Sequence, residues 1–395
     1  MKLSDVYPPE GHVQSLSCDK CAGPLDLVFA DFNEDVSEVT ISIKGLPHLR
    51  CVRCSKDHLP DNSRFAIIKL HEEAVAQSSS RVNVTRRASD QRFGFTNIDF
   101  LYSADDYRYI PGLERPWDKG FLTPVFFNKA VLLKYDALPD YEVRFASTTY
   151  GTIYGKDFYI SFGINKNGKV IMWLGDLAKL AEPEQYYLRS ENVPSDHSIA
   201  SEFYDGQIGV QFTDHTAEDE LFKLRSEFIA AIAGKIGVKI AHLDDEVINA
   251  TVGFNPPLLD TPKERRHVAD ILNKIYVESW NNAALGEAIA SQGGDPGRLG
   301  TLKRLQMVLE KLAPATDIPS LMSPFFVLYD FRVAASHLTS EETNTEIMKT
   351  VTDRLALAEA SDLQMIYARL IAELLKSFKM LKSLFSAPEE GAVEE

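Results

Sequence analysis

The spacing of hydrophobic positions along the chain changes near residue 217. Before that point, apolar residues form short runs broken by Gly, Pro and Asn, a pattern that is typical of strands. After it, apolar residues return at steps of three and four among Ala, Leu, Glu and Lys, which predicts helices. The sequence therefore predicts a multidomain α+β chain in which the strands come first and the helices follow.

The clearest strand signal lies in "GTIYGKDFYISFGINKNGKVIMWLGDL", residues 151–177. We expect "FYISFGIN" and "KVIMWLGD" to be two strands, because the Asn167–Gly168 pair between them favours a hairpin turn. This hairpin belongs to a predicted β-rich sensor or binding domain over residues 93–216. Its aromatic side chains either fill a small core or stack on bases or another ligand. They are Trp117, Phe126, Phe127, Tyr150, Tyr154 and Tyr159.

The rest of the chain predicts an all-helical domain over residues 217–385, and such a domain packs as a bundle by default. We expect its helices at 217–234, 262–291, 297–313, 319–338, 341–358 and 361–385. The start signals are Thr216 with Asp219, Pro262 in a first turn, and Ser340 beside Glu342 and Thr343. The polar tail at 386–395 is expected to be disordered.

All four cysteines lie near the start of the chain, as "CDKC" (Cys18 and Cys21) and "CVRC" (Cys51 and Cys54). Two thiolates separated by two residues close a tight turn, called a knuckle, around one metal ion. Two such knuckles complete a tetrahedral four-sulfur shell with no open position. The pattern therefore predicts a zinc ribbon over residues 1–70 that holds one structural zinc ion per chain.

The segment between the two cysteine pairs agrees with this prediction. "VTISIKG" alternates as a strand does, and Gly45 and Pro47 supply a turn before the second knuckle. The phrase "IKGLPHLRCVRC" resembles the YgiT-type zinc ribbon of some bacterial antitoxins. The alternatives are a pair of disulfides or a redox CxxC motif; a reducing compartment disfavours the first, and the second would not need two copies.

Residues 71–92 are polar and rich in serine, which predicts a connector, with room for a short helix at its start. Its basic part contains Arg81, Arg86, Arg87 and Arg92 against a single Asp90. This basic stretch is either a solvated linker or a contact for RNA or DNA. The net charge of −15 argues against a surface that binds nucleic acid broadly, because such binding depends on Lys and Arg that neutralise phosphates.

Composition limits the class of protein. A chain of 395 residues is too long for one ordinary core, and contents of 45% hydrophobic and 25% charged residues are those of a globular protein. No apolar run approaches the length of a membrane span, and the first residues lack the basic start and apolar stretch of a signal peptide. We therefore expect a cytoplasmic protein with no membrane partner.

The stretch "YDFRVAASHL", residues 329–338, carries an arginine and a histidine near the end of a predicted helix. Arg332 and His337 are five residues apart, about 140° around a helix, so they project from different faces. Two arrangements bring them together: the helix ends near His337 and the long arginine reaches back, or a second copy of the helix lies across a two-fold axis. Asp330 is a candidate to orient the histidine.

The Arg-x4-His spacing within this helical region resembles that of the HEPN superfamily, whose ribonuclease members carry Arg-x4-6-His on a helical bundle that dimerises. The resemblance implies metal-independent cleavage of an RNA substrate by attack of its own 2′-hydroxyl. Arg332 and His337 would be the catalytic pair of a homodimer formed through the helical domain. His337 would act as general acid or base and Arg332 would bind the phosphate. Many active members have a polar residue directly after the arginine, where this chain has Val333.

The combination of ribbon, β-rich domain and HEPN-like bundle suggests an endoribonuclease of a bacterial anti-phage, abortive-infection or toxin system, triggered by a phage or host protein. The alternative is a non-catalytic regulator or adaptor that binds protein or nucleic acid. In that case Arg332 pairs with a carboxylate and His337 caps the helix C-terminus. A third hypothesis, a metal-dependent hydrolase that uses His197 or His215, competes with surface loops that hold these histidines.

Overall fold

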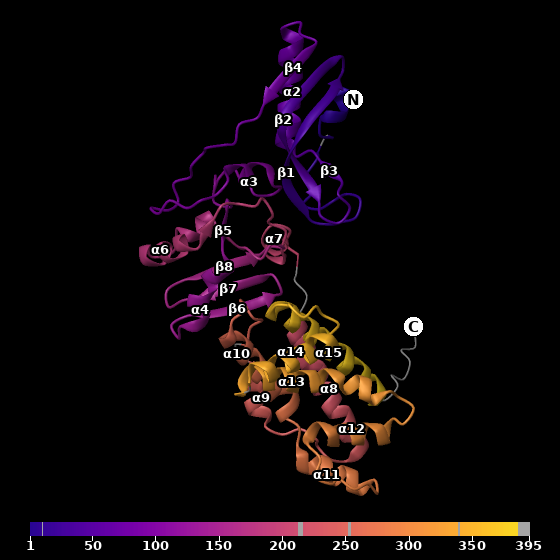
Figure 1. Ribbon diagram of the computed structural model, residues 1–395. Coiled ribbons are helices and arrows are strands. Elements are labelled where there is room, and N and C mark those ends of the chain that lie inside the picture. Colours follow the sequence, from indigo (N-terminus) through magenta and orange to yellow (C-terminus); the bar gives the residue numbers. More distant parts are fainter. Residues whose placement is uncertain (10, 212–215, 252–253, 339, 386–395) are drawn as a thin grey trace, which may run out of the picture. The chain divides into compact units, whose positions relative to one another are not determined.

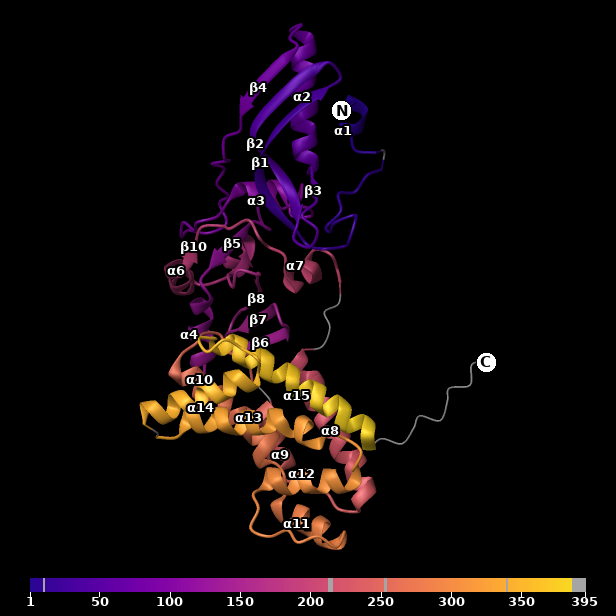
Figure 2. The same ribbon diagram turned by 45° about the vertical axis from the view of Figure 1, so that its right-hand side comes forward.

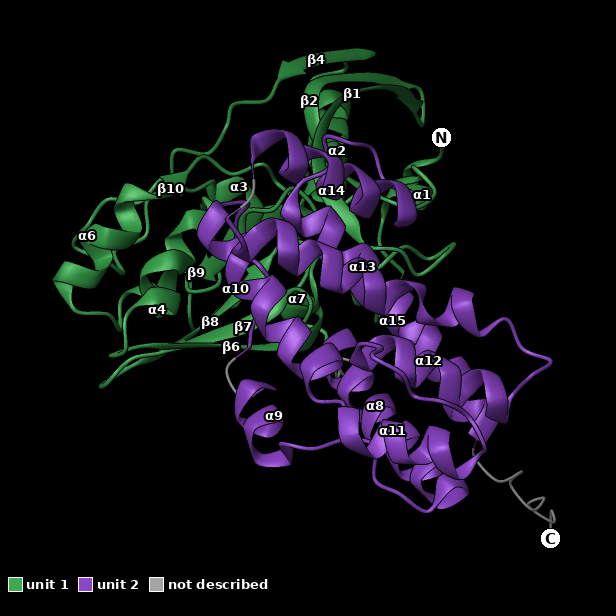
Figure 3. Ribbon diagram, turned by 60° about the horizontal axis from the view of Figure 1, so that its bottom comes forward, with its two compact units in different colours: residues 1–214 green, residues 215–395 purple. Residues whose placement is uncertain are grey.

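The computed structural model describes residues 1–9, 11–211, 216–251, 254–338 and 340–385. The chain forms two compact units, Met1–Asp214 and His215–Glu395, drawn in green and purple in Figure 3. The first unit contains two sheets, and the second contains helices (Figure 1). This order confirms the predicted mixed α/β chain with a β-rich middle and a helical C-terminal region. The expected disordered tail at 386–395 lies outside the described residues.

The first sheet is built on a long antiparallel hairpin. β1 (Leu25–Val36) pairs with β2 (Val39–Cys51) along the whole length of both strands. The other edge of β2 pairs with β3 (Asp57–His58), antiparallel, and with β4 (Arg81–Thr85), parallel. Gly45, predicted to lie in a turn, lies within β2 at φ +71°, opposite a shift in register between Ala30 and Phe32. The glycine therefore makes a bulge, where its positive φ is tolerated, and the strand continues.

Helix α2 (Asp61–Ala76) lies along this sheet (Figures 1 and 2), and short α1 (Leu3–Val6) precedes it in the chain. Ile67 and Ile68 of α2 belong to one buried cluster with Ile41 and Ile43 of β2. The connector predicted at 71–92 had room for a short helix at its start, and this agrees with α2, which continues to Ala76. The prediction is corrected at residues 81–85, which form β4. β4 is held by backbone hydrogen bonding to the edge of β2, and Val82 packs against the buried cluster of this sheet.

The second sheet has the strand order β10-β5-β9-β8-β7-β6, with every neighbouring pair antiparallel. Its strands are β5 (Pro124–Phe127), β6 (Glu142–Ser147), β7 (Tyr150–Tyr154), β8 (Tyr159–Ile164), β9 (Val170–Trp173) and β10 (Asn192–Val193). The helices between them are α3 (Ala104–Tyr109), η1 (Lys129–Leu132), α4 (Leu133–Ala137), α5 (Leu174–Leu177), α6 (Glu182–Ser190) and α7 (Glu202–Gln207). The predicted hairpin is confirmed as β8–β9, with Gly168 at φ +72° in its turn.

The aromatic residues of this region divide between buried and exposed positions. Phe126 and Phe127 are completely buried in β5, as core residues are. Trp117 and Tyr159 are 78% and 71% exposed, and Tyr154, which faces Tyr159 across β7 and β8, is 39% exposed. The exposed rings fill no core.

A single buried cluster joins the start of the chain to the second sheet. Cys18 and Cys51 share this cluster with Phe126 of β5, Trp173 of β9 and Phe203 of α7. The predicted ribbon (1–70), connector (71–92) and β-rich domain (93–216) are therefore packed together in one unit. Sequence patterns missed this because the two sheets meet through side chains far apart along the chain.

The second unit is a packed set of helices around one core. Its helices are α8 (Ala217–Ile236), α9 (Asp244–Thr251), α10 (Pro262–Asn273), the π-helix η2 (Lys274–Glu278), α11 (Asn282–Ser291), α12 (Thr301–Leu312), α13 (Ile318–Ser336), α14 (Glu341–Arg354) and α15 (Leu363–Phe385). The predicted caps are confirmed at Thr216, which accepts from the Asp219 N–H at 3.1 Å, and at Ser340, which accepts from the Thr343 N–H at 3.2 Å. α9 was not predicted.

The predicted single helix over 262–291 is wrong, because the chain leaves the α-helical path after Asn273. The buried Arg225 of α8 donates from Nε to the Ile275 carbonyl at 3.0 Å and from Nη2 to the Ser279 hydroxyl at 2.8 Å. Asn281 then caps α11 by accepting from the N–H groups that follow it. A π-helical turn is a local widening of a helix that is often found near functional sites. Here the buried guanidinium of Arg225 binds the Ile275 carbonyl of this turn.

Helix α13 is the central helix of this unit. It packs against α10, α12, α14 and α15. Its buried residues occupy most of its circumference, as expected of a helix enclosed by others. They are Ile318, Met322, Pro324, Phe325, Val327, Leu328, Phe331 and Ala334. The polar residues near its C-terminal end are therefore held at a fixed position in the unit.

Among the helices of the described residues, none combines the length and the apolar content needed to span a membrane.

We predict that Arg225→Met destabilises the helical unit by about 1–3 kcal/mol, because it removes a buried charged donor from the Ile275 carbonyl and the Ser279 hydroxyl and leaves the carbonyl with the Ser279 O–H as its side-chain donor. The methionine keeps the apolar stem of the side chain. Urea unfolding of the full chain measures the change. Arg298→Met, at an exposed arginine, is the matched control and should change the free energy of unfolding by less than about 0.5 kcal/mol. Equal losses in the two variants would contradict this role of Arg225.

Candidate functional sites

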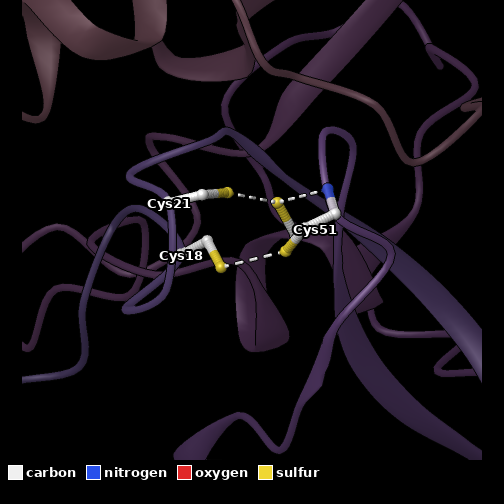
Figure 4. A group of neighbouring side chains, drawn as sticks. Cys18, Cys21 and Cys51 are labelled. Carbon is white, nitrogen blue, oxygen red and sulfur yellow. Dashed lines mark hydrogen bonds between the residues drawn. The ribbon is translucent and has the colours of Figure 1, made fainter.

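The first candidate site is the group of four cysteines. The sulfur atoms of Cys18, Cys21, Cys51 and Cys54 all lie within 4.8 Å of one another. The Sγ atoms of Cys18 and Cys54 are 3.7 Å apart, and those of Cys21 and Cys51 are 3.5 Å apart. Figure 4 shows the side chains of Cys18 and Cys21 directed toward the second cysteine pair. The four residues that the spacing predicted as metal ligands are thus brought together.

Each cysteine pair lies in a tight turn at one end of the β1–β2 hairpin. The Ala22 N–H donates to the Cys18 carbonyl at 2.8 Å, and the Ser55 N–H donates to the Cys51 carbonyl at 2.9 Å. Gly23 lies so close to the second turn that a Cβ added there would be 3.0 Å from the Cys51 sulfur. The first turn can approach the second because this position has no side chain.

The environment of Cys51 favours its thiolate form. Burial of the Cys51 sulfur disfavours the charge, but the N–H groups of Cys54 and Arg53 outweigh that effect and lower the pKa of Cys51 to about 6. A cysteine that binds a metal ion does so as the thiolate. Beside the cluster, Lys56 donates to the Asp19 carboxylate at 2.8 Å, which lowers the pKa of Asp19.

The spacing of the sulfur atoms distinguishes a metal site from disulfides. A disulfide requires sulfur atoms about 2.05 Å apart, so neither close pair is bonded. Four thiolates placed tetrahedrally at about 2.3 Å from one ion have sulfur atoms about 3.8 Å apart, close to the two distances found here. The cluster is compatible with a metal site.

The second candidate site is the pair Arg332 and His337. Nη1 of Arg332 lies 2.6 Å from Nε2 of His337. α13 ends at Ser336, and His337 has an extended backbone conformation of φ −92° and ψ 149°. The end of the helix therefore turns the histidine back toward the arginine within one chain, which is the first of the two arrangements expected for residues five apart.

The chemistry of the two groups sets the direction of this hydrogen bond. A guanidinium only donates, so Nε2 of His337 accepts from Nη1 of Arg332. The site thus places an imidazole nitrogen with a lone pair, the kind of atom that a general base uses, beside a permanent positive charge.

Two carboxylates surround the arginine. Nε of Arg332 lies 3.6 Å from Oδ1 of Asp270, and Nη2 lies 3.9 Å from Oε1 of Glu278. Ser336 also donates to Asp270 at 2.7 Å, and Asn273 donates to Glu278 at 2.8 Å. The pair of residues found by spacing therefore belongs to a larger polar group contributed by α10, η2 and α13. Sequence reasoning missed Asp270 and Glu278, which lie about 60 residues away from Arg332.

Asp330 does not have the expected role of orienting the histidine. Its Oδ2 lies 3.3 Å from Nη1 of Arg354 on α14. Asp330 and His337 would superpose on a continuous helix, but α13 ends before His337.

Sequence reasoning also missed a polar group in the first unit. His197 Nδ1 lies 2.6 Å from Oδ1 of Asp106, and Ser195 donates to Oδ2 of the same carboxylate at 2.6 Å. Asp106 is completely buried, and burial raises the pKa of its carboxyl group. Burial by itself would lower the pKa of His197, but the Asp106 carboxylate outweighs it and raises that pKa. Asp106 is 91 residues from His197 along the chain, so no local spacing in the sequence could predict that they pair.

The histidines that suggested a second metal site do not form one in the described residues. His197 is paired with Asp106 as above, and the only cation-ligand groupings among described residues contain Cys18. His215 lies outside the described residues. In the basic stretch, Arg86 pairs with Asp105 and its guanidinium carbon lies 4.2 Å above the Phe29 ring. That arginine is an internal contact of the first unit.

No protein-family model, curated protein or solved structure matches this chain. The resemblances to the HEPN superfamily and to the YgiT-type ribbon therefore stay predictions.

The Asp106–His197 pair predicts a pH dependence of stability. The pKa of His197 is raised by folding, so its contribution is fully present below its unfolded value of 6.5 and is lost as the pH rises through the folded value. The free energy of unfolding of the first unit should fall from about pH 6 to about pH 8. Asp106→Asn removes the carboxylate, after which burial lowers the pKa of His197 and reverses this part of the slope.

Urea unfolding of the full chain at the two pH values measures the slope. His197→Gln should abolish the contribution, whereas His267→Gln, at an exposed histidine of the helical unit, is the control for loss of an imidazole. An unchanged slope in both Asp106→Asn and His197→Gln would refute the assignment.

Proposed function

We propose that this protein is a metal-independent endoribonuclease whose reaction centre is the Arg332–His337 pair at the end of α13. The single observation that supports it is the 2.6 Å contact between Nη1 of Arg332 and Nε2 of His337. The two side chains would otherwise project from different faces of the helix. A phosphate that binds the guanidinium at this place lies next to the imidazole.

The reaction needs a base and an acid. When Nη1 of Arg332 leaves Nε2 of His337 to bind the phosphate, that nitrogen is free to accept the proton of the ribose 2′-hydroxyl. The hydroxyl oxygen attacks the adjacent phosphorus, and the bond from phosphorus to the 5′-oxygen breaks. The leaving 5′-oxygen takes up a proton, so the products end in a 2′,3′-cyclic phosphate and a 5′-hydroxyl. DNA has no 2′-hydroxyl and is not a substrate.

Arg332 has the electrostatic role. Its guanidinium binds two phosphate oxygens at once and stabilises the charge that grows on them in the transition state. Asp270 and Glu278 lie 3.6 Å and 3.9 Å from it, so they hold the guanidinium in place without short ion pairs. A phosphate can therefore compete for its N–H groups.

One imidazole cannot be base and acid in the same step. A homodimer through the helical unit would supply a second His337 as the acid, which agrees with the assembly that the HEPN resemblance implies. The proposed role by analogy is that of a bacterial anti-phage, abortive-infection or toxin nuclease acting on cytoplasmic RNA. The first unit would sense a phage or host protein.

We also propose that the four cysteines hold one structural zinc ion per chain. A shell of four thiolates has no open position, so the ion would stabilise the fold and take no part in RNA cleavage. Because Cys18 and Cys51 share a core with the second sheet, the ion would stabilise the whole first unit.

The competing function is a non-catalytic regulator or adaptor. It is favoured by the carboxylates near Arg332 and by the position of His337 as the C-cap of α13, where its N–H donates to the Val333 carbonyl at 3.1 Å. In that case Arg332 and His337 would only stabilise the C-terminal end of α13, where a positive charge interacts favourably with the helix dipole. The two functions differ in whether RNA is cleaved.

We predict that the purified protein cleaves RNA in the presence of EDTA. Arg332→Ala should lower the rate by about 10²–10³-fold and His337→Ala by about 10²–10⁴-fold, since they remove a phosphate-binding charge and a general base. Gel analysis of labelled RNA, with mass spectrometry of the 2′,3′-cyclic phosphate ends, measures the effect.

Arg266→Ala and His267→Ala, at exposed neighbouring positions of α10, are matched controls and should cleave like the wild type. The nuclease proposal is wrong if Arg332→Ala and His337→Ala retain wild-type cleavage, or if no RNA is cut by wild-type protein while both variants only lose stability.

For the cysteine cluster we predict one zinc ion per chain by native mass spectrometry. Cys51→Ser should lose the ion and lower the unfolding midpoint of the first unit, because structural zinc in small modules binds with about 10–16 kcal/mol of apparent free energy. Val52→Ala, at an exposed position of the same knuckle, should keep the bound zinc ion and the wild-type unfolding midpoint. Full stability of Cys51→Ser without bound metal would rule out a structural ion.

A further inference from the structure

A pocket opens beside the Arg332–His337 pair. It has a volume of about 340 Å³ and lies where η2, the start of α12 and one side of α13 meet. This size is within the range of about 300–1,000 Å³ that is typical of small-molecule sites. We call it the α12–α13 pocket and define it by Asn273, Glu278, Lys303, Phe326, Tyr329 and Arg332.

Arg332 belongs to both sites. Its Nη1 is 2.6 Å from His337, and the same side chain lines the pocket. A group bound in the pocket is therefore next to the atoms proposed to cleave RNA.

One side of the pocket is aromatic. Phe326 and Tyr329 are three residues apart on α13, so they lie on the same side of the helix as Arg332. Tyr329 is 46% exposed, although it sits on the central, otherwise buried helix of the unit. An exposed ring at the mouth of a pocket offers a face on which a base can stack.

Positive charge lies next to the aromatic rings. Lys303 Nζ lies 4.7 Å from the centre of the Phe326 ring. α12 begins at Thr301, and its N-cap Gly300 provides no side-chain hydrogen bond, so the first N–H groups of the helix are open to an anion. With Arg332, these groups form a phosphate-binding side of the pocket.

A carboxylate supplies hydrogen-bond acceptors beside the pocket. The buried Asn273 donates from Nδ2 to Oε1 of Glu278 at 2.8 Å and so helps to hold this carboxylate in place. The Glu278 side chain is 50% exposed, so a ligand with N–H groups can reach it. Base edges carry such donors.

We propose that the α12–α13 pocket binds one nucleotide of single-stranded RNA, the one next to the phosphate that is cleaved. The base stacks on Tyr329, Lys303 and Arg332 bind its phosphate, and Glu278 accepts from its N–H groups. This inference rests on the proposed nuclease function for its place in a reaction, but nucleotide binding can be tested without cleavage. Duplex RNA, whose bases are already stacked and paired, does not fit.

The test measures binding of a 2′-O-methyl RNA oligonucleotide, which cannot be cleaved because the attacking hydroxyl is blocked, to the full-length protein by fluorescence anisotropy. Tyr329→Ala should weaken binding roughly fivefold to a hundredfold. Lys303→Ala should weaken it and reduce the slope of log Kd against log salt by about one. The same oligonucleotide annealed to its complement should bind without dependence on Tyr329.

Both substitutions are at exposed side chains, so folding should be preserved. The controls are Met380→Ala, which has the same 46% exposure on α15, and Lys349→Ala on α14; both should bind like the wild type. The pocket assignment is overturned if Tyr329→Ala and Lys303→Ala also bind single-stranded RNA like the wild type, whether or not the protein cleaves RNA. If binding depends on both residues but no RNA is ever cleaved, the pocket stands and the nuclease function fails.

Discussion

The burial of α13 on most of its circumference is the constraint on which the helical unit depends. Phe325, Leu328 and Phe331 are completely buried, and four neighbouring helices pack on this one. Truncation of a buried phenylalanine to alanine in a tightly packed core lowers the free energy of unfolding by roughly 3–5 kcal/mol. The packing fixes the rotation of α13 about its axis, and with it the direction of the few polar side chains that the helix carries.

The polar group at the C-terminal end of α13 follows from this packing and from a second buried contact. The helix ends at Ser336, which lets His337 lie against Arg332. The widened turn after Asn273, whose Ile275 carbonyl is bound by Arg225, brings Glu278 to the same place. The position of the Arg332–His337 pair and of the pocket beside it thus depends on the packing of several helices. Positions held by packing in this way are more exact than positions on loops.

In the first unit, the cysteine cluster is part of the core and not an appendage. The buried residues around Cys18 and Cys51 continue into the second sheet through Phe126 and Trp173. A metal ion held by these sulfur atoms would be linked thermodynamically to the folding of both sheets. The close approach of the two cysteine turns requires glycine at position 23, so the hairpin and the cluster constrain one another.

Local patterns in the sequence determined the elements whose physics is local. They include the β8–β9 hairpin with its Asn167–Gly168 turn, the helix caps, and the four cysteines, whose spacing alone specifies two knuckles. Tertiary structure decided what depends on distant contacts: strand β4, held by the edge of β2, the π-helical turn at Arg225, and the joining of the first three predicted segments into one unit. The sequence named Arg332 and His337, but only the end of α13, set by packing, brought them together, since helical geometry alone separates residues five apart.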